Sequence, residues 1–288
     1  MYDMVHAMRT RIITSQSFTG GANGRVLGAI LFENTMDRAI DGIPTGEFLW
    51  TKKQIVPFLK CDKGLEAEAN GVQLMKPMPD LDALLQRAKA KGIFGTKMRS
   101  NINAANEAGI RAIVEQQFAV GKQIIGHGLV PILEPEVNIT SPDKAESEVL
   151  LKKYLLEGLN ALPEDQHVML KVSLPSVVNH YKECIEHPRC ICVVALSGGY
   201  ALDEANAILE KQVRSCFQYM LFDCVIVVVH VLVADPNMSP HNYLTQKGMI
   251  ASFSRALVEG LSHTQPQEEF DATLALTVDA IFKASIAG

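Results

Sequence analysis

A single charge, Lys171, stands inside the apolar, strand-like run His167-Val-Met-Leu-Lys-Val-Ser-Leu-Pro175. A lysine at such a position either extends its ammonium group to solvent or is held inside for chemistry. Burial lowers the pKa of an amine, and the neutral amine that results can attack a carbonyl group. Most lysines near strand ends are surface groups, so the interpretation depends on whether similar positions recur along the chain.

Similar apolar runs do recur, at a spacing of about 30 residues that is typical of strand–helix–strand units. They are Val26–Glu33, Ile55–Lys60, Gly92–Lys97, Leu129–Glu134, Val168–Lys171, Ile191–Leu196 and Met249–Phe253. Helical patterns lie between or before them, at 1–11, 80–91, 104–126 and 141–159. Uniformly apolar strands that alternate with helices indicate a buried parallel sheet.

The runs predict an α/β fold, a TIM (β/α)8 barrel for which seven strands are counted, one short of eight. An open doubly wound sheet is the alternative, but no glycine-rich turn follows the first run. In a barrel the carboxyl ends of the strands converge on one mouth. The polar groups expected there are Glu33, Lys60, Lys97, Glu134, Lys171 and Ser197.

Several lysines around an acid suit an anionic carbonyl substrate. A neutral lysine amine attacks a ketone to give a carbinolamine and then a protonated Schiff base, which withdraws electrons from the neighbouring C–C bond. A second lysine nearby lowers the pKa of the first by like-charge repulsion. Glu134 or Glu136 can carry protons while the imine forms and hydrolyses.

A phosphate site is expected after the last two strands. Ser197, Gly198 and Gly199 follow one of them, and Ser254 and Arg255 follow the other. These loops are the usual phosphate site of the barrel, where glycine lets backbone N–H groups approach an anion and arginine binds it through two hydrogen bonds.

Composition excludes some classes of partner. The net charge is −5 and no strong block of one sign occurs, so neither nucleic acid nor a membrane surface is indicated as a partner. The six cysteines lack zinc-ligand spacing, and their scatter predicts buried free thiols in a reducing cytoplasm. Whether the chain forms a homo-oligomer stays open.

Six motifs in order together resemble class I fructose-1,6-bisphosphate aldolase, in the short form of bacteria and some microbial eukaryotes. They are Phe58-Leu-Lys-Cys-Asp-Lys-Gly64, Gly95-Thr-Lys-Met-Arg-Ser100, Gly128-Leu-Val-Pro-Ile-Leu-Glu-Pro-Glu136, Met169-Leu-Lys171, Leu196-Ser-Gly-Gly199 and Ser252-Phe-Ser-Arg-Ala-Leu257. The resemblance implies a lyase of glycolysis and gluconeogenesis that splits fructose 1,6-bisphosphate into dihydroxyacetone phosphate and glyceraldehyde 3-phosphate. It implies no metal and no cofactor.

The resemblance also assigns roles to residues. Lys171 would form the Schiff base, Glu134 would accept the proton, and Lys97 would assist electrostatically. Lys60 and Arg99 would hold the sugar bisphosphate, and one of its phosphates would bind at the two loops described above, at Ser197, Gly198, Gly199, Ser254 and Arg255. Lys63 and Glu136 are interpreted as structural ion-pair or hydrogen-bond partners.

Two features depart from the family pattern. The family begins with a strand of the Ala-Leu-Asp-Gln-Ser-Gly-Gly type, which has no match here, so two exposed sheet edges are expected. Residues 213–246 have no counterpart either, and an almost wholly apolar run from Cys216 to Ala234 lies inside them. Asp223 and His230 within that run argue against a membrane anchor.

We therefore expect one barrel domain over 1–288 that is interrupted by an insert at 213–246. Gln212-Val-Arg214 and Leu244-Thr-Gln246 can be encoded as splice-site consensus, so one hypothesis is a translated intron. The other is a genuine insertion that forms a hydrophobic interaction hairpin. The lack of the first strand also leaves a second function open, a catalytically impaired barrel fragment that is an interaction protein or a faulty gene product.

Overall fold

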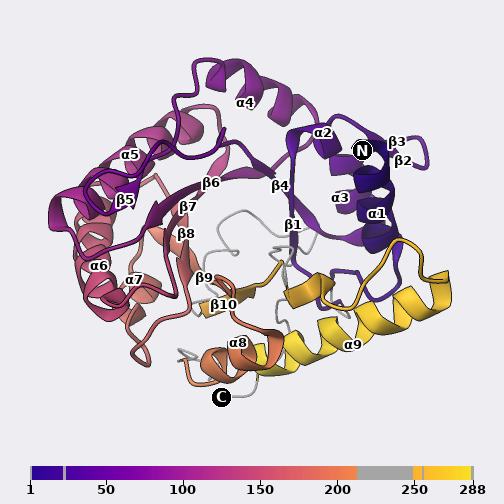
Figure 1. The fold of residues 1–288 in the computed structure, drawn as a ribbon. Helices are drawn as coiled ribbons and strands as arrows, with labels where there is room; N and C mark the ends of the chain where they lie inside the picture. The colour runs from indigo at the N-terminus through magenta and orange to yellow at the C-terminus, as the bar shows by residue number, and fades with distance from the viewer. Residues whose placement is uncertain (1, 22–23, 213–248, 255, 287–288) are drawn as a thin grey trace.

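Parallel strands form a sheet that curls into a barrel wall, and helices cover its outer face (Figure 1). The computed structural model describes residues 2–21, 24–212, 249–254 and 256–286. Within these residues, seven parallel strands follow one another around the wall in chain order. They are β1 (Gly28–Leu31), β4 (Val56–Lys60), β6 (Gly95–Ile102), β7 (Val130–Val137), β8 (Val168–Ser173), β9 (Cys190–Leu196) and β10 (Met249–Ser252).

Each of these strands overlaps one of the seven predicted apolar runs, so the predicted barrel class is confirmed. The predicted helices correspond to α1, α4, α5 and α6, and the last three carry buried apolar residues toward the sheet. The helices are α1 (Tyr2–Thr14), α2 (Glu33–Met36), α3 (Thr45–Lys53), α4 (Leu81–Ala90), α5 (Glu107–Gly126), α6 (Lys144–Asn160), α7 (Lys182–Glu186), α8 (Leu202–Leu209) and α9 (Gln267–Ile286).

Several short elements lie outside the path of seven parallel strands. A short strand, β5 (Val72–Gln73), pairs antiparallel with β6, and β2 (Ala39–Ile40) pairs with β3 (Ile43–Pro44) in a separate hairpin. A 3-10 turn, η2 (Ala256–Val258), follows β10.

The alternation of side chains along each strand separates the core from the site. On β6, Ser100 faces α5, where the Gln117 amide donates to its hydroxyl over 2.9 Å. Successive side chains of a strand point to opposite faces. Lys97 and Arg99 therefore point into the barrel. The side chains that alternate with them along β6, including Ser100, point toward the covering helices.

The first and last described helices are tied together beside β1 (Figure 1). The Arg11 guanidinium on α1 donates to the carbonyl of Gln265 over 2.9 Å and lies 4.1 Å from the centre of the Phe270 ring on α9. Arg25 forms an ion pair with Asp279 of the same helix. Segments far apart in the sequence are thus in contact beside β1.

The predicted insert at 213–246 and the predicted site residue Arg255 lie outside the described residues, so both stay predictions. Among the helices that the structure does describe, none combines the length and the apolar character needed to cross a bilayer.

Gly95 tests the close packing of the barrel interior. A Cβ atom there would lie 2.2 Å from the carbonyl oxygen of Val130 and 2.8 Å from the Phe58 ring. We expect Gly95→Ala to lower the free energy of unfolding by roughly 1–3 kcal/mol, the usual cost of overpacking. Denaturant unfolding measures this change.

Gly126, which ends α5, is the matched control because an added Cβ would meet no atom within 4 Å. Gly126→Ala should raise stability by about 0.4–1 kcal/mol through a less flexible unfolded chain. Equal effects of the two substitutions would contradict the packing described for Gly95.

Candidate active site

Three ionised side chains from neighbouring strands meet inside the barrel. The Glu134 carboxylate on β7 lies between two lysine ammonium groups, with Oε2 2.7 Å from Lys97 Nζ and Oε1 3.0 Å from Lys171 Nζ. All three side chains are buried. The register of the sheet brings these side chains together, because Arg99 of β6 pairs with Glu134 of β7 and Leu133 of β7 pairs with Leu170 of β8. Glu134 and Lys171 therefore lie at one level of the barrel, and Lys97 lies one inward-facing position below.

The two lysines that share this carboxylate have pKa values shifted in opposite directions. Burial would raise the pKa of Glu134, but Lys171 and Lys97 overcome it and lower that pKa to about 2. Burial lowers the pKa of Lys171; Glu134 opposes this shift, Lys97 adds to it, and the pKa stays below its ordinary value. Burial also lowers the pKa of Lys97, but Glu134 and Asp62 outweigh it and leave that pKa raised. Of the two amines, Lys171 is thus the better nucleophile.

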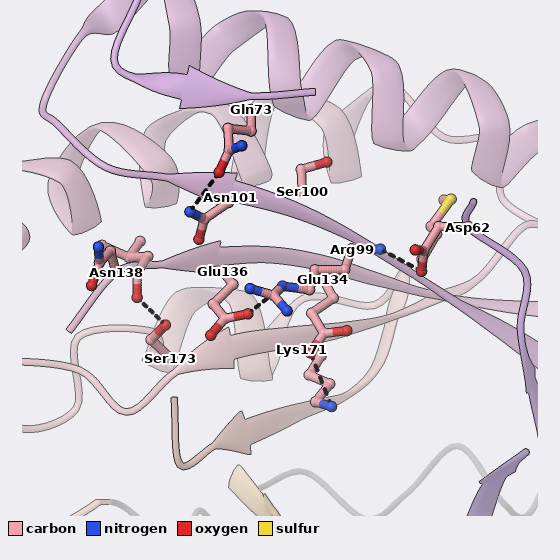
Figure 2. A network of polar contacts seen from close by, with 12 residues as sticks. Asp62, Gln73, Arg99, Ser100, Asn101, Glu134, Glu136, Asn138, Lys171 and Ser173 are labelled. Atoms are coloured by element: carbon pink, nitrogen blue, oxygen red, sulfur yellow. Dashed lines mark hydrogen bonds and ion pairs between the residues drawn. The ribbon is translucent and has the colours of Figure 1, made fainter. Parts of the chain in front are cut away.

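A second ion pair lies nearer the mouth (Figure 2). Arg99 Nε is 2.5 Å from Glu136 Oε2, one inward-facing position beyond Lys97 and Glu134 on the same strands. Burial raises the pKa of Glu136, and Arg99 only partly opposes this shift. The expectation that Glu136 forms an ion pair is confirmed.

The mouth holds a cavity of about 400 Å³. Nine of the ten predicted site residues line it, and the tenth, Arg255, lies outside the described residues. The nine are Lys60, Lys97, Arg99, Glu134, Lys171, Ser197, Gly198, Gly199 and Ser254. The structure therefore brings the predicted residues to one place, while their roles stay predictions.

The loop after β9 has a backbone that suits an anion. Gly198 and Gly199 have φ of +62° and +118°, a region that residues with a Cβ rarely adopt. A Cβ at Gly198 would also come within 2.8 Å of the Ile139 side chain. Two such glycines allow close approach of the backbone to a ligand at the edge of the cavity.

Glu33 was expected at the mouth, and this prediction is wrong. Helix α2 begins at Glu33, two positions after the end of β1, and Glu33 is not among the residues that line the cavity. Glu33 instead pairs with Lys63 over 2.7 Å and with Arg87 of α4. The expected ion-pair role of Lys63 is confirmed by the same contact.

Three residues at the site were not predicted from the sequence. Asp62 contacts both Lys60 and Lys97. Phe32 lines the cavity, and the Arg9 guanidinium lies 4.4 Å from the centre of its ring. Asp62 lies within a quoted motif, which was a usable signal. Arg9 lies on α1, and its pattern in sequence indicated only an amphipathic helix.

Neither an exposed thiol nor a cluster of metal-ligating side chains is found among the described residues. The described cysteines are Cys61, Cys184, Cys190 and Cys192, all free and buried, as expected. Burial raises the pKa of Cys61 to about 12, which keeps this neighbour of the lysines protonated. No three metal-ligating side chains gather at one point anywhere in the described ranges.

Fold and site together define a class: a (β/α)8-barrel enzyme with two buried lysine amines that share a carboxylate inside the barrel, the arrangement of lysine-dependent lyases. Comparison with known proteins narrows that class. Residues 6–189 match the family model described as fructose-bisphosphate aldolase class-I.

Two curated relatives carry the name fructose-bisphosphate aldolase class 1. The protein of Porphyromonas gingivalis is 50% identical over 286 residues, which is 99% of this chain and 84% of the relative. That of Synechocystis sp. is 51% identical over 286 residues, 99% of this chain and 83% of the relative. The chain therefore belongs to the class I fructose-bisphosphate aldolases, a family of lyases.

A solved structure agrees in fold. It is a fructose-bisphosphate aldolase from Plasmodium falciparum in complex with TRAP and a small-molecule inhibitor. The TM-score is 0.66 at 16% identity, and the match covers 99% of this chain and 95% of that chain. At this identity the likeness extends to the barrel fold alone.

Glu134→Gln tests the buried ion pairs through stability. The substitution leaves Lys171 without its carboxylate, and breaking a buried pair costs about 3–5 kcal/mol at neutral pH. The pKa of Glu134 is depressed in the folded state, so its stabilisation is present above its ordinary pKa and is lost as pH falls toward 2. The stability difference between wild type and variant should therefore shrink in acid, as measured by denaturant unfolding at several pH values.

Glu115→Gln is the control, because Glu115 pairs with Arg111 on the exposed face of α5. Exposed pairs of this kind contribute little to stability. A loss at Glu134 no greater than that at Glu115, or one that does not change with pH, would contradict the pairing.

Proposed function

We propose that this chain reversibly cleaves fructose 1,6-bisphosphate into dihydroxyacetone phosphate and glyceraldehyde 3-phosphate through a Schiff base on Lys171. The observation that carries the proposal is the Lys97–Glu134–Lys171 arrangement, in which one buried carboxylate holds two amines of unequal proton affinity. Family membership supplies the substrate class, and the arrangement supplies the nucleophile.

The reaction begins when the neutral Nζ of Lys171 attacks the ketone carbon of the open-chain sugar. The carbinolamine then loses water to give a protonated imine. Glu134, which is ionised and 3.0 Å from the same Nζ, is the group that carries protons to and from the departing or attacking water. Lys97 keeps its positive charge beside Glu134 and stabilises the negative charge that develops on oxygen.

Cleavage follows from the charge on the imine. The electron pair of the C–C bond next to the imine carbon moves onto the nitrogen and leaves an enamine. The neighbouring hydroxyl becomes the aldehyde carbonyl as its proton passes to a base, for which we propose Glu134. Protonation of the enamine and hydrolysis of the imine then release dihydroxyacetone phosphate and the free lysine.

The two phosphates would bind at opposite sides of the cavity. We propose Ser197, Gly198, Gly199, Ser254 and Arg255 for the ketose-side phosphate. Lys60 and Arg99 would hold the other part of the sugar bisphosphate at the edge formed by β4 and β6. Charge-assisted hydrogen bonds from lysine and arginine suit phosphate oxygens at both places.

The proposed location is the cytoplasm, where the four described cysteines would stay reduced. The proposed partners are sugar bisphosphates and triose phosphates. A homo-oligomer stays a prediction.

Borohydride trapping tests the proposed nucleophile. Wild-type protein incubated with dihydroxyacetone phosphate and reduced with borohydride should carry a stable adduct on the Lys171 peptide, as located by mass spectrometry. Lys171→Arg cannot form the imine and should show no adduct and at least about 100-fold slower cleavage.

Lys152→Arg is the control, because Lys152 is a partly exposed lysine that pairs with Glu183 on the outer face. It should leave adduct and activity unchanged. A folded wild-type protein that forms no adduct would contradict the proposal and favour the catalytically impaired barrel.

A further inference from the structure

We propose that Asp62 is a positioning residue that decides which of the two lysines beside Glu134 is the nucleophile. It holds Lys97 as an ammonium and so leaves Lys171 as the amine that gives up its proton. This inference deepens the proposed function and rests on it, because it assigns the control of the Schiff-base lysine to a residue outside the lysine–glutamate–lysine arrangement.

Asp62 is built into the wall of the site. It follows the end of β4 by two residues and is buried. Its Oδ1 lies 2.5 Å from Lys60 Nζ and accepts a hydrogen bond from the Gly64 N–H over 3.3 Å. Its Oδ2 accepts from the Arg99 N–H over 3.3 Å (Figure 2). The carboxylate is thus held by the backbone of two segments and cannot follow a side chain that moves.

The contacts of Asp62 make the two lysines unequal. Lys97 Nζ lies 2.7 Å from Glu134 and 3.8 Å from Asp62 Oδ2. Within the described residues, Lys171 forms one ion pair, that with Glu134. Two ammonium groups that share one carboxylate repel each other, and a second carboxylate beside only one of them fixes the charge there.

Among the described residues, the charged groups joined by ion pairs around this point come from four neighbouring segments. They are Lys60 and Asp62 at the end of β4, Lys97 and Arg99 on β6, Glu134 and Glu136 on β7, and Lys171 on β8. Four cations face three carboxylates, so loss of one carboxylate leaves an excess of positive charge in a buried site. Such an excess is relieved when an ammonium group loses its proton.

The proton affinities agree with this geometry. Burial lowers the pKa of both lysines and Glu134 raises both, but Asp62 is among the causes that raise the pKa of Lys97 only. The thiol of Cys61 takes no part, because burial and Asp62 raise its pKa to about 12.

Asp62→Asn removes the charge and keeps the shape. Lys97 should then lose its proton more readily. A neutral Lys97 no longer lowers the pKa of Lys171 by charge repulsion, so Lys171 should hold its own proton more firmly. After borohydride reduction with dihydroxyacetone phosphate, we expect part of the adduct to move from Lys171 to Lys97. We expect the pH dependence of the Lys171 adduct to shift upward by up to about one pH unit, and kcat near neutral pH to fall at least about tenfold.

The test separates control of the proton from a merely structural role. An adduct that stays on Lys171 alone with the wild-type pH dependence would overturn the proposal, even if activity falls. Asp82→Asn is the matched control, since Asp82 is an exposed carboxylate on α4 that contacts Gln123 of α5 and His127, which follows that helix. In this variant, both the location of the borohydride adduct and the pH dependence of its formation should equal those of wild type.

A second variant and the wild-type adduct complete the test. Where Asp62→Asn does not fold, judged by circular dichroism, Lys97→Met carries the test. Loss of the ammonium that Asp62 holds should raise the pH at which Lys171 reacts, and an unchanged pH dependence would overturn the inference. A wild-type protein without any adduct refutes the proposed function itself, whereas a normal wild-type adduct with no effect of Asp62 refutes only this inference.

Discussion

The Glu134 carboxylate, buried between the ammonium groups of Lys97 and Lys171, is the interaction on which the site depends. Two lysines inside a barrel would repel each other and would cost several kcal/mol to bury without a counter-ion. The carboxylate makes their burial tolerable and, at 2.7 Å and 3.0 Å, fixes both amines toward the same space. Buried groups with opposed shifts of proton affinity are the usual mark of acid–base chemistry.

The barrel supplies the precision that this interaction needs. Adjacent parallel strands hold Arg99 opposite Glu134, and each strand presents every second residue to the interior. A slip of one residue on β7 would turn Glu134 toward the helices and bury it without a partner. The close packing around Gly95 below the site limits such slips, since no space is left for even one added carbon between β6 and β7.

Much of this arrangement could be predicted from the sequence, for physical reasons. Seven uniformly apolar runs indicated a buried parallel sheet, and the recurrence of charges at the ends of such runs, as at Lys171, indicated that these side chains gather at one mouth of the barrel. Glu33 was predicted wrongly because no apolar pattern shows that a helix begins at the last residue of a run. Asp62 was missed because it acts beyond the strand end, where the backbone of Gly64 and Arg99 rather than any pattern fixes the side chain. The contact of Arg9 with Phe32 depends on how α1 packs, which short-range patterns do not specify.

The most direct test of the account is competitive labelling of the lysine amines in the unmodified protein without substrate. A reagent that reacts only with neutral amines would be applied in trace amounts between about pH 6 and 11, and the labelled peptides would be quantified by mass spectrometry. We expect Lys171 to titrate below an ordinary lysine and Lys97 to titrate above it. Reaction of Lys97 at the lower pH, or titration of both amines together at the ordinary pKa, would contradict the unequal sharing of Glu134.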